Sequence, residues 1–277
     1  MNRSILLTGG TGFVGRQILK SLLNRNVDVT LVVRSETERF ESCSKKVKTI
    51  PTDNIFKEST CWFERACKGI DTIIHAAWFA KHGEYLNSPI NLDCLISTLK
   101  FAKVAANSGI KKFVGIGTCL EYDTNYELLS LDTPLLPKSP YAAAKAAAYM
   151  MLQQYFGEMK STDFAWCRLF YMYGEHEDQR RLVPYLRNCL ENGIPAELSD
   201  GNQIRDYMDV SDVGFKIAKV AVEAFYGPMN ICSGMPRTIR DLAFEIADNY
   251  GRRDLLRFST RTKLTNDPLR VVGEPSI

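Results

Sequence analysis

Tyr141 and Lys145 are the two side chains in this sequence best suited to acid–base chemistry. They stand four positions apart in the run Tyr-Ala-Ala-Ala-Lys, so on a helix they lie on the same face. A phenol has an ordinary pKa near ~10, and a neighbouring ammonium group stabilises the phenolate and lowers that pKa. The pair could therefore exchange a proton with a substrate near neutral pH. The same spacing also arises by chance, so its place in the fold has to support it.

A glycine-rich segment, residues 8–15, has the pattern of a turn that holds a dinucleotide. It follows the apolar run 5–7 and precedes apolar residues at helical spacing, so a buried strand turns into a helix here. Gly9 permits a tight reversal of the chain, Gly12 lets a pyrophosphate approach the backbone, and Gly15 lets the helix pack closely on the strand. An ordinary glycine-rich turn is the alternative. The cofactor residues predicted in this segment are Gly9, Gly12, Phe13, Val14 and Gly15, with backbone N–H groups facing the phosphates.

Strand and helix patterns alternate through the first 170 residues and must position these groups. Buried strands are predicted at 5–7, 27–33, 47–50, 72–75, 112–116 and 165–168. Helices are predicted at 14–23, 61–66, 86–107 and 141–156, and residues 36–46 as a loop or weak helix. This alternation predicts an α/β fold, a Rossmann-like doubly wound parallel sheet with helices on both faces.

The pattern becomes looser after residue 170, where loops and prolines increase. Helices are predicted at 182–192, 212–224 and 239–250, and a strand at 229–231. We expect a dinucleotide-binding domain over residues 1–170 and, over 171–277, a smaller C-terminal lobe that binds substrate. Residues 204–232 are expected to return to the first domain. Such a lobe would hold a substrate over the carboxyl edge of the sheet, where ligands bind in open α/β folds.

Composition excludes several classes of partner. Lys and Arg number 35 against 32 Asp and Glu, a net charge of +3, which argues against nucleic-acid and membrane partners. There is no apolar run near 18 residues, and the first strand begins too early to leave room for a signal peptide. The eight cysteines form no CxxC pair and the three histidines lack metal-ligand spacing. We therefore expect a cytoplasmic protein with no metal site.

The surroundings of the Tyr–Lys pair strengthen its candidacy, because it opens the helix after the fifth predicted strand, beyond a loop that begins Gly117-Thr118. Here the chain resembles the extended short-chain dehydrogenase/reductase family, the NAD(P)-dependent nucleotide-sugar epimerases, dehydratases and reductases. The matching pieces occur in the family's order over nearly the whole chain. They are 8–15, 75–77, Asn91, 117–122, 141–145, 168–174 and 205–213.

The resemblance implies three catalytic roles. Tyr141 is the proton donor or acceptor, Lys145 holds the nicotinamide ribose and lowers the pKa of the phenol, and Thr118 bonds the substrate oxygen. The resemblance implies further contacts with the cofactor. Asp53 and Asn54 would contact the adenine, and Ala76 and Ala77 would line the pyrophosphate and ribose. Asn91 and Phe170 would lie near the nicotinamide half.

On the substrate side, the resemblance matches Arg205 to an arginine that grips the phosphates of the sugar nucleotide, a task suited to its planar fork. A surface ion pair with Asp206 is the alternative for Arg205. The other residues expected to line the substrate are Trp78, Thr118, Cys119, Tyr141, Tyr171 and Leu182.

Departures from the family pattern narrow the reaction. Dehydratases of this kind place Asp-Glu directly after the catalytic Thr, where this chain has Cys119 and Leu120, so a 4,6-dehydratase is disfavoured. Some epimerase/reductases carry Cys two positions after the Ser or Thr, which is Leu120 here, so we interpret Cys119 as packing or a pocket wall. Glu121 is either a pocket carboxylate or a solvated loop residue. The remaining Thr, Tyr and Lys suit reduction of a 4-keto group, or 4-epimerisation.

The end of the second predicted strand bears on the cofactor. Members that prefer NAD carry an acid there for the ribose hydroxyls, whereas this chain has Arg34 and Ser35. These two would suit a 2′-phosphate, so NADP(H) is favoured over NAD(H). Arg16 could assist or simply be solvated, and Arg34 could instead stack on the adenine.

A closer resemblance, in residues 77–78, 85–89, 117–122 and 181–184, is to small bacterial reductases of nucleotide-linked 4-keto-6-deoxyhexoses that serve deoxysugar, surface-polysaccharide and O-antigen biosynthesis. The leading hypothesis is thus NADPH-dependent reduction of such a nucleotide sugar. A 4-epimerase with tightly bound NAD is the alternative, and a non-catalytic NAD(P)-binding sensor or scaffold is another. The family's usual dimer surfaces are the helices around 92–106 and from Tyr141, so a homodimer is expected; burial inside the monomer is the alternative.

Overall fold

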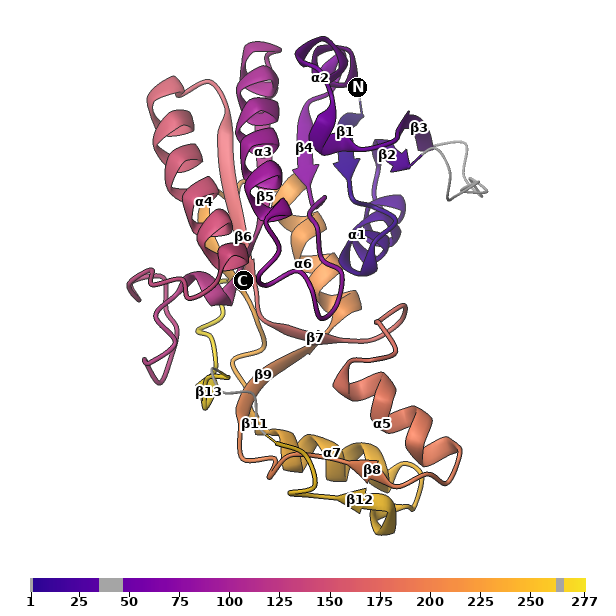
Figure 1. The fold of residues 1–277 in the computed structure, drawn as a ribbon. Coiled ribbons are helices and arrows are strands. Elements are labelled where there is room, and N and C mark those ends of the chain that lie inside the picture. The colour runs from indigo at the N-terminus through magenta and orange to yellow at the C-terminus, as the bar shows by residue number, and fades with distance from the viewer. Residues whose placement is uncertain (1, 35–46, 263–266) are drawn as a thin grey trace.

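A seven-stranded parallel sheet organises most of the chain (Figure 1), which the computed structural model describes over residues 2–34, 47–262 and 267–277. Its spatial order is β10-β6-β5-β4-β1-β2-β3, and every neighbouring pair is parallel. The strands are β1 (Arg3–Thr8), β2 (Val27–Arg34), β3 (Val47–Thr52), β4 (Thr72–His75), β5 (Lys112–Thr118), β6 (Asp163–Leu169) and β10 (Gly227–Ile231). The order reverses between β1 and β4, which makes a crevice at that carboxyl edge the expected ligand site. The predicted Rossmann-like α/β fold is confirmed.

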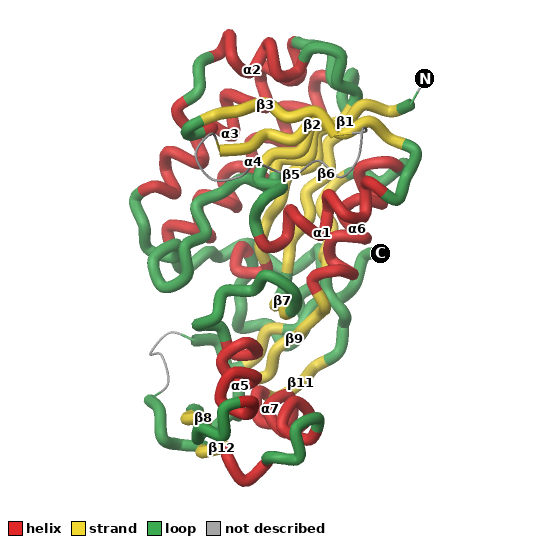
Figure 2. Tube along the Cα trace, turned by 90° about the vertical axis from the view of Figure 1, so that its right-hand side faces the viewer, coloured by secondary structure: helices red, strands yellow, loops and turns green. Residues whose placement is uncertain are grey.

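Helices cover both faces of this sheet (Figure 2), which is why its strands are buried runs of apolar residues. On one face lie α1 (Phe13–Leu23) and α6 (Val210–Val222), joined to the sheet by one apolar cluster. On the other face lie α2 (Thr60–Cys67), α3 (Ile90–Asn107) and α4 (Pro140–Met159), which form a second cluster. No helix in these described ranges has the length and apolar character needed to cross a membrane.

The start of α3 differs from the expectation of a helix over 86–107, because the helix begins at Ile90. Proline lacks an N–H group and pushes the residue before it away from helical angles, so Ser88-Pro89 fixes the start. The preceding residues form turns instead, and the carbonyl of Leu86 accepts a hydrogen bond from the N–H of Tyr141 at 3.0 Å. The non-helical segment thereby reaches the beginning of α4.

A smaller lobe extends beyond the carboxyl edge of the main sheet (Figure 1). Its central strand β9 (Ile204–Asp209) pairs in parallel with β7 (Tyr171–Tyr173) and β13 (Arg270–Val271), and antiparallel with β11 (Pro236–Thr238). Further out, α5 (Leu182–Glu191) and α7 (Ile239–Asp248) pack with the short pair β8 (Ala196–Glu197) and β12 (Leu256–Arg257) around a third apolar cluster. The chain returns to the main sheet with α6 and β10, whereas β9 stays in the lobe.

Candidate active site

The glycine turn has the close backbone packing that a dinucleotide cradle needs. Gly9 has φ of 70°, and a Cβ there would lie 2.6 Å from the backbone nitrogen of Ala77. A Cβ on Gly15 would lie 2.0 Å from the carbonyl oxygen of Gly9. The N–H groups of Phe13 and Val14, in the first turn of α1, have no acceptor within the helix. Gly12, the exposed N-cap residue, has no side chain that could cap them. These features fit a dinucleotide pyrophosphate.

His75 ties the cradle to the end of β4. Its Nδ1 bonds the hydroxyl of Thr8 at 2.8 Å, and its Nε2 bonds that of Thr98 at 3.0 Å. The Thr8 hydroxyl oxygen also accepts from the N–H of Ala77 at 3.2 Å, which holds Ala76 and Ala77 opposite the glycines. Burial, with a smaller contribution from Lys145, lowers the pKa of His75 to about 3. His75 is therefore neutral and acts as a structural link.

Thr118 ends β5 and begins the short 3-10 helix η2 (Cys119–Glu121) as its N-cap. Its hydroxyl oxygen accepts from the N–H of Leu120 at 3.3 Å, and its own N–H donates to a Glu121 carboxylate oxygen at 2.8 Å. This reciprocal pattern is a capping box. The Thr118 side chain is also close enough to the Tyr141 phenol to influence its pKa. The fold thus brings the expected Thr and Tyr together, although they are 23 positions apart.

Tyr141 lies in the first turn of α4, which Ser139 caps through a hydrogen bond from the N–H of Ala142 at 3.2 Å. Its ring lies edge-on to those of Tyr85, at 4.9 Å between centroids, and Trp78, at 6.5 Å. Desolvation raises the pKa of the Tyr141 phenol, and the nearby Thr118 side chain offsets part of that rise. The phenol therefore carries its proton at neutral pH.

Lys145 follows one turn later and is buried beneath the same rings. Its Nζ donates to the carbonyl of Ile116 at 2.6 Å and lies 3.7 Å from the centroid of the Trp78 ring. Burial lowers the pKa of Lys145 to about 7. Among the described residues no hydrogen bond joins Lys145 to Tyr141, and burial is the largest influence on the phenol pKa, which it raises. The expected lowering of that pKa by Lys145 stays a prediction.

Asn91, expected near the nicotinamide half of the cofactor, uses its amide within the protein. Its Oδ1 accepts from the indole N–H of Trp78 at 2.9 Å, and its Nδ2 donates to the carbonyls of Tyr85 and Ser88 at 2.6 and 2.9 Å. Both amide protons are thus engaged. Asn91 thereby holds Trp78 over the ammonium of Lys145, while contact of Trp78 with substrate stays a prediction.

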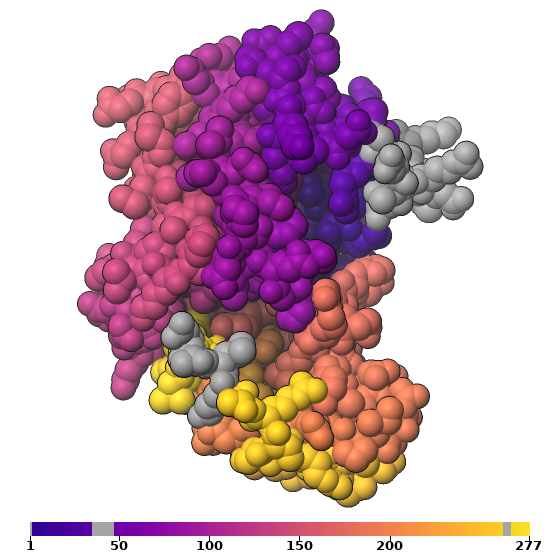
Figure 3. Space-filling view, viewed as in Figure 1, coloured from indigo at the N-terminus to yellow at the C-terminus, as the bar shows by residue number. Residues whose placement is uncertain are grey.

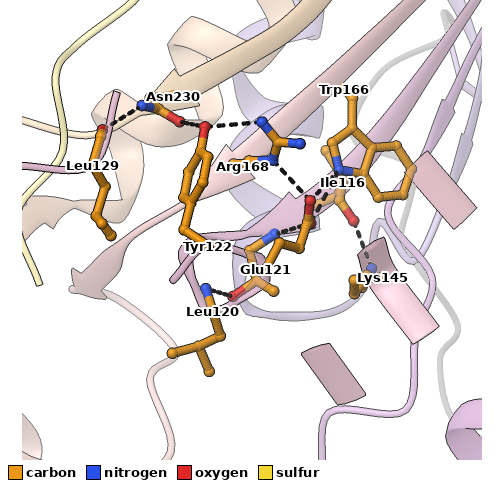
Figure 4. A network of polar contacts seen from close by, with 10 residues as sticks. Ile116, Leu120, Glu121, Tyr122, Leu129, Lys145, Trp166, Arg168 and Asn230 are labelled. Atoms are coloured by element: carbon orange, nitrogen blue, oxygen red, sulfur yellow. Dashed lines mark hydrogen bonds and ion pairs between the residues drawn. The ribbon is translucent and has the colours of Figure 1, made fainter. Parts of the chain in front are cut away.

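Glu121 is neither a pocket carboxylate nor a solvated loop residue. Its side chain is completely buried and accepts from the indole N–H of Trp166 and from Nε of Arg168, the latter at 2.8 Å (Figure 4). Burial raises the pKa of Glu121, whereas Arg168 and the N–H donors of Thr118 and Trp166 counteract that rise. Sequence reasoning missed this pair, although a charged residue in the apolar strand 165–168 was a usable signal.

Cys119 and Phe170 lie together in a small buried cluster that also contains Tyr122, Cys232 and Val271. Burial raises the pKa of the Cys119 thiol to about 12, so it stays a neutral thiol. This placement agrees with the interpretation of Cys119 as a packing or wall residue.

Arg205 and Tyr171 come from neighbouring strands of the lobe, β9 and β7. The Arg205 guanidinium is almost fully buried, donates to Asp267 at 2.5 Å and lies 5.1 Å from the centroid of the Tyr171 ring. Its ion-pair partner is thus Asp267 and not Asp206, which instead accepts from the N–H and hydroxyl of Ser233. Contact of Arg205 with phosphates stays a prediction.

The remaining expected residues that the structure describes lie at or just after the ends of β2 and β3 and at the start of α5. Arg34 is exposed at the end of β2 and Asp53 is exposed after β3, while Asn54 caps the 3-10 helix η1 (Ile55–Lys57) through its side chain. Ser35 and the segment 36–46 lie outside the described residues. Leu182 is half-buried at the start of α5.

Two residues that sequence reasoning did not assign join the two parts of the site. Tyr85 packs on Tyr141. Burial raises the pKa of Tyr85, and the nearby charge of Arg181, the N-cap residue of α5, counteracts that rise. Figure 3 shows a recess where the main-sheet part of the molecule meets the lobe. Both residues lie in segments, 85–89 and 181–184, that the sequence analysis had singled out for their resemblance to reductases.

Comparisons with known proteins agree with this architecture. The model of the NAD dependent epimerase/dehydratase family matches residues 5–232. A dTDP-6-deoxy-L-talose 4-dehydrogenase (NAD(+)) from Aggregatibacter actinomycetemcomitans is 22% identical, covering 98% of this chain and 99% of its own length. The CDP-abequose synthase of Salmonella typhimurium is 24% identical, covering 76% of this chain and 67% of the synthase.

Two solved structures share the fold. A UDP-N-acetylglucosamine 4-epimerase from Methanobrevibacter ruminantium, in complex with UDP-N-acetylmuramic acid, superposes with a TM-score of 0.88 at 23% identity, covering 99% of this chain and 90% of that one. A UDP-glucose 4-epimerase from Thermus thermophilus, in complex with NAD, has a TM-score of 0.81 at 23% identity, covering 98% and 90%. The match of the family model to most of the sequence, together with the cradle and the Thr–Tyr–Lys cluster, shows that this chain belongs to the NAD-dependent epimerase/dehydratase family.

Proposed function

We propose that this protein reduces the 4-keto group of a nucleotide-linked 4-keto-6-deoxyhexose, such as a dTDP- or CDP-linked sugar, with NADPH. The observation that carries the proposal is the convergence of Thr118, Tyr141 and Lys145 at the carboxyl end of β5. Removal of water from a sugar would need a further acid and base. Position 119 holds a neutral buried thiol, and Glu121 faces Arg168. The site therefore suits chemistry at a single carbinol carbon.

The residues have distinct parts in this reaction. A bound nicotinamide supplies the hydride that reaches carbon 4 of the sugar. Thr118 and Tyr141 donate hydrogen bonds to the 4-keto oxygen, and Tyr141 transfers its proton as the alkoxide forms. The Lys145 ammonium stabilises the phenolate left behind, and solvent returns the proton to Tyr141.

The choice of NADPH rests on Arg34, which is exposed at the end of β2 where an acid would select NAD. A guanidinium there suits the 2′-phosphate of NADP. The name of the talose dehydrogenase specifies NAD⁺, so the preference needs a separate measurement. We also propose a cytoplasmic location, because an enzyme that consumes NADPH needs a compartment that supplies it.

We also propose a homodimer, with α3 and α4 at the interface. Exposed apolar side chains gather on these helices at Leu92, Ile96, Met150 and Met151, and such patches commonly mark protein–protein contacts. Light scattering during size-exclusion chromatography should give twice the mass of the chain. A monomer at micromolar concentration would contradict this assembly.

The test of the proposed function is a screen of cofactor oxidation. Purified protein is mixed with NADPH or NADH and with dTDP-, GDP-, CDP- and UDP-linked 4-keto-6-deoxyhexoses, and the product is identified by mass and sugar configuration. We expect NADPH oxidation with at least one substrate, in step with formation of the deoxysugar nucleotide. Absence of hydride transfer with every substrate, beside preserved NADPH binding, would overturn the proposal and favour a sensor or scaffold.

A 4-epimerase is the second candidate, because the same three residues suffice for it and the two solved structures above are 4-epimerases. Such an enzyme should purify with bound NAD and interconvert 4-epimers without added cofactor. The same screen, run with UDP-hexoses and no NADPH, separates the two activities.

A further inference from the structure

The carboxylate of Glu121 is completely buried, yet it accepts a hydrogen bond from the backbone of Thr118, a residue expected in catalysis. Its two oxygens accept from the N–H of Thr118 at 2.8 Å, the indole N–H of Trp166 at 3.0 and 3.2 Å, and Nε of Arg168 at 2.8 Å. A buried carboxylate is costly unless its partners are complete. The arrangement meets that condition within the described residues.

The local geometry links this carboxylate to the Thr118 hydroxyl. Glu121 holds the Thr118 N–H while the N–H of Leu120 donates to the Thr118 oxygen, so both the backbone and the side chain of Thr118 are fixed. One lone pair of the hydroxyl is occupied by Leu120, and its proton remains free for donation to Tyr141 or to a substrate oxygen. Rotation of Thr118 would break this capping box.

A glycine makes the approach of these groups feasible. A Cβ at Gly117 would lie 2.2 Å from the indole nitrogen of Trp166 and 2.4 Å from a Glu121 carboxylate oxygen. Both distances are too short for any side chain, so residue 117 has to be glycine for the carboxylate and the indole to meet below Thr118.

The carboxylate is braced by a longer network that spans three strands (Figure 4). Nη1 of Arg168 donates to the Tyr122 hydroxyl at 2.8 Å, which donates to Oδ1 of Asn230 at 2.8 Å. Nδ2 of Asn230 donates in turn to the carbonyl of Leu129 at 2.9 Å. The ends of β5, β6 and β10 are thereby joined, and Glu121 has little freedom to move away from Thr118.

We propose that Glu121 is a positioning residue, whose buried carboxylate sets the backbone and rotamer of Thr118 so that the Thr118 hydroxyl faces Tyr141 and the sugar oxygen. It donates no proton and does not touch substrate. The proposal rests on the proposed function in one respect only, namely that Thr118 contacts the reacting oxygen.

A double-mutant cycle between Glu121→Gln and Thr118→Ala tests the proposal. The amide keeps the shape of the carboxylate but turns an NH₂ group toward either Thr118 or Arg168, so one donor loses its acceptor. We expect E121Q alone to lower kcat roughly 10- to 100-fold, with KM and the NADPH Kd changed less than about 2-fold. In the T118A background, E121Q should lower kcat less than about 2-fold further.

Equal losses of kcat in both backgrounds would overturn the proposal, because Glu121 would then act on the site without Thr118. Thr162→Val is the matched control: it removes a buried hydroxyl that bonds the Ile110 carbonyl at 2.8 Å, away from the site, and kcat should stay within about 2-fold. If E121Q does not fold, Glu121→Asp replaces it in the cycle, because the shorter acid keeps its charge but cannot span the same contacts.

The proposal can fail independently of the proposed function. If the wild type turns over no 4-keto sugar and no 4-epimer, the proposed function falls, and the rotamer of Thr118 is then read from three-bond couplings in methyl-labelled protein. We expect a single rotamer in the wild type and rotamer averaging in E121Q. An unchanged single rotamer in E121Q would overturn the positioning role, whatever reaction the protein catalyses.

Discussion

The two sides of the candidate site differ in how they are packed: one depends on the absence of side chains, and the other on buried polar side chains. The cofactor cradle, residues 8–15 with Ala76 and Ala77, works by leaving out side chains so that backbone can approach backbone. The corner around Thr118 works by filling the interior with charged and polar side chains whose partners are complete. The cradle should therefore lose cofactor binding when atoms are added, and the corner around Thr118 should lose activity when a charge or a proton donor is removed.

The strongest test of the cradle is Gly15→Ala. The added Cβ would lie 2.0 Å from the carbonyl oxygen of Gly9 and 2.7 Å from Cα of Gly10, and both are backbone atoms. We expect NADPH binding to weaken by roughly 100-fold or more and the free energy of unfolding to fall by about 1–3 kcal/mol. Titration calorimetry and thermal unfolding measure the two effects.

Gly157→Ala supplies the control, since this exposed glycine lies within α4 and a Cβ there meets nothing within 4 Å. It should raise stability by about 0.5–1 kcal/mol and leave NADPH binding unchanged. Normal cofactor affinity in the Gly15→Ala variant would contradict the account of the cradle.

The other side of the comparison predicts that Lys145→Met loses activity but gains stability. The folded pKa of Lys145 is lowered to about 7 by burial, so the unfolded chain binds more protons than the folded chain between pH 7 and its ordinary pKa of about 10.4. Wild-type stability therefore rises with pH across this window and carries the full penalty below it. At pH 7 the variant should be more stable by roughly 1–2 kcal/mol.

The gain should shrink as the pH rises and approach zero only above about 10.4, where the lysine is uncharged in both states. Denaturant unfolding of both proteins at several pH values measures this difference. A variant that is less stable at pH 7, or a stability difference that does not change with pH, would show that burial of the charged Lys145 amine does not destabilise the folded protein.

The smallest predicted effect concerns the rim of the cradle. Arg34→Gln should raise the NADPH Kd by about 10-fold and leave the NADH Kd within about 2-fold, because only NADP carries the 2′-phosphate. Lys20→Gln, an equal loss of charge at an exposed position in the last turn of α1, should change neither. Equal weakening of both cofactors would instead indicate stacking of Arg34 on the adenine.

The same contrast explains what could be predicted from the sequence. The glycine turn and the Tyr141–Lys145 pair each lie within eight consecutive residues, so spacing alone indicated their geometry. The Glu121 network could not be read in this way, because its donors Trp166 and Arg168 stand 45 and 47 positions away. Only the fold brings them together.

The lobe shows the same limit. The short strand β9 contains two charged residues, Arg205 and Asp206, that are buried in the structure. Their partners, Asp267 and Ser233, lie far away in the sequence, so the pattern of β9 alone did not indicate burial. The start of α3 is a different case, since Pro89 was a local signal for a later helix start. Residue pattern thus predicted the main sheet well, and the small paired strands of the lobe poorly.

The central claim, that Tyr141 passes the proton at one carbinol carbon, is tested most directly by the kcat of Tyr141→Phe on the substrate found in the screen. The account predicts a fall of at least about 10³-fold, with the NADPH Kd within about 2-fold of the wild type because the cradle is untouched. Near-normal turnover of this variant would contradict it.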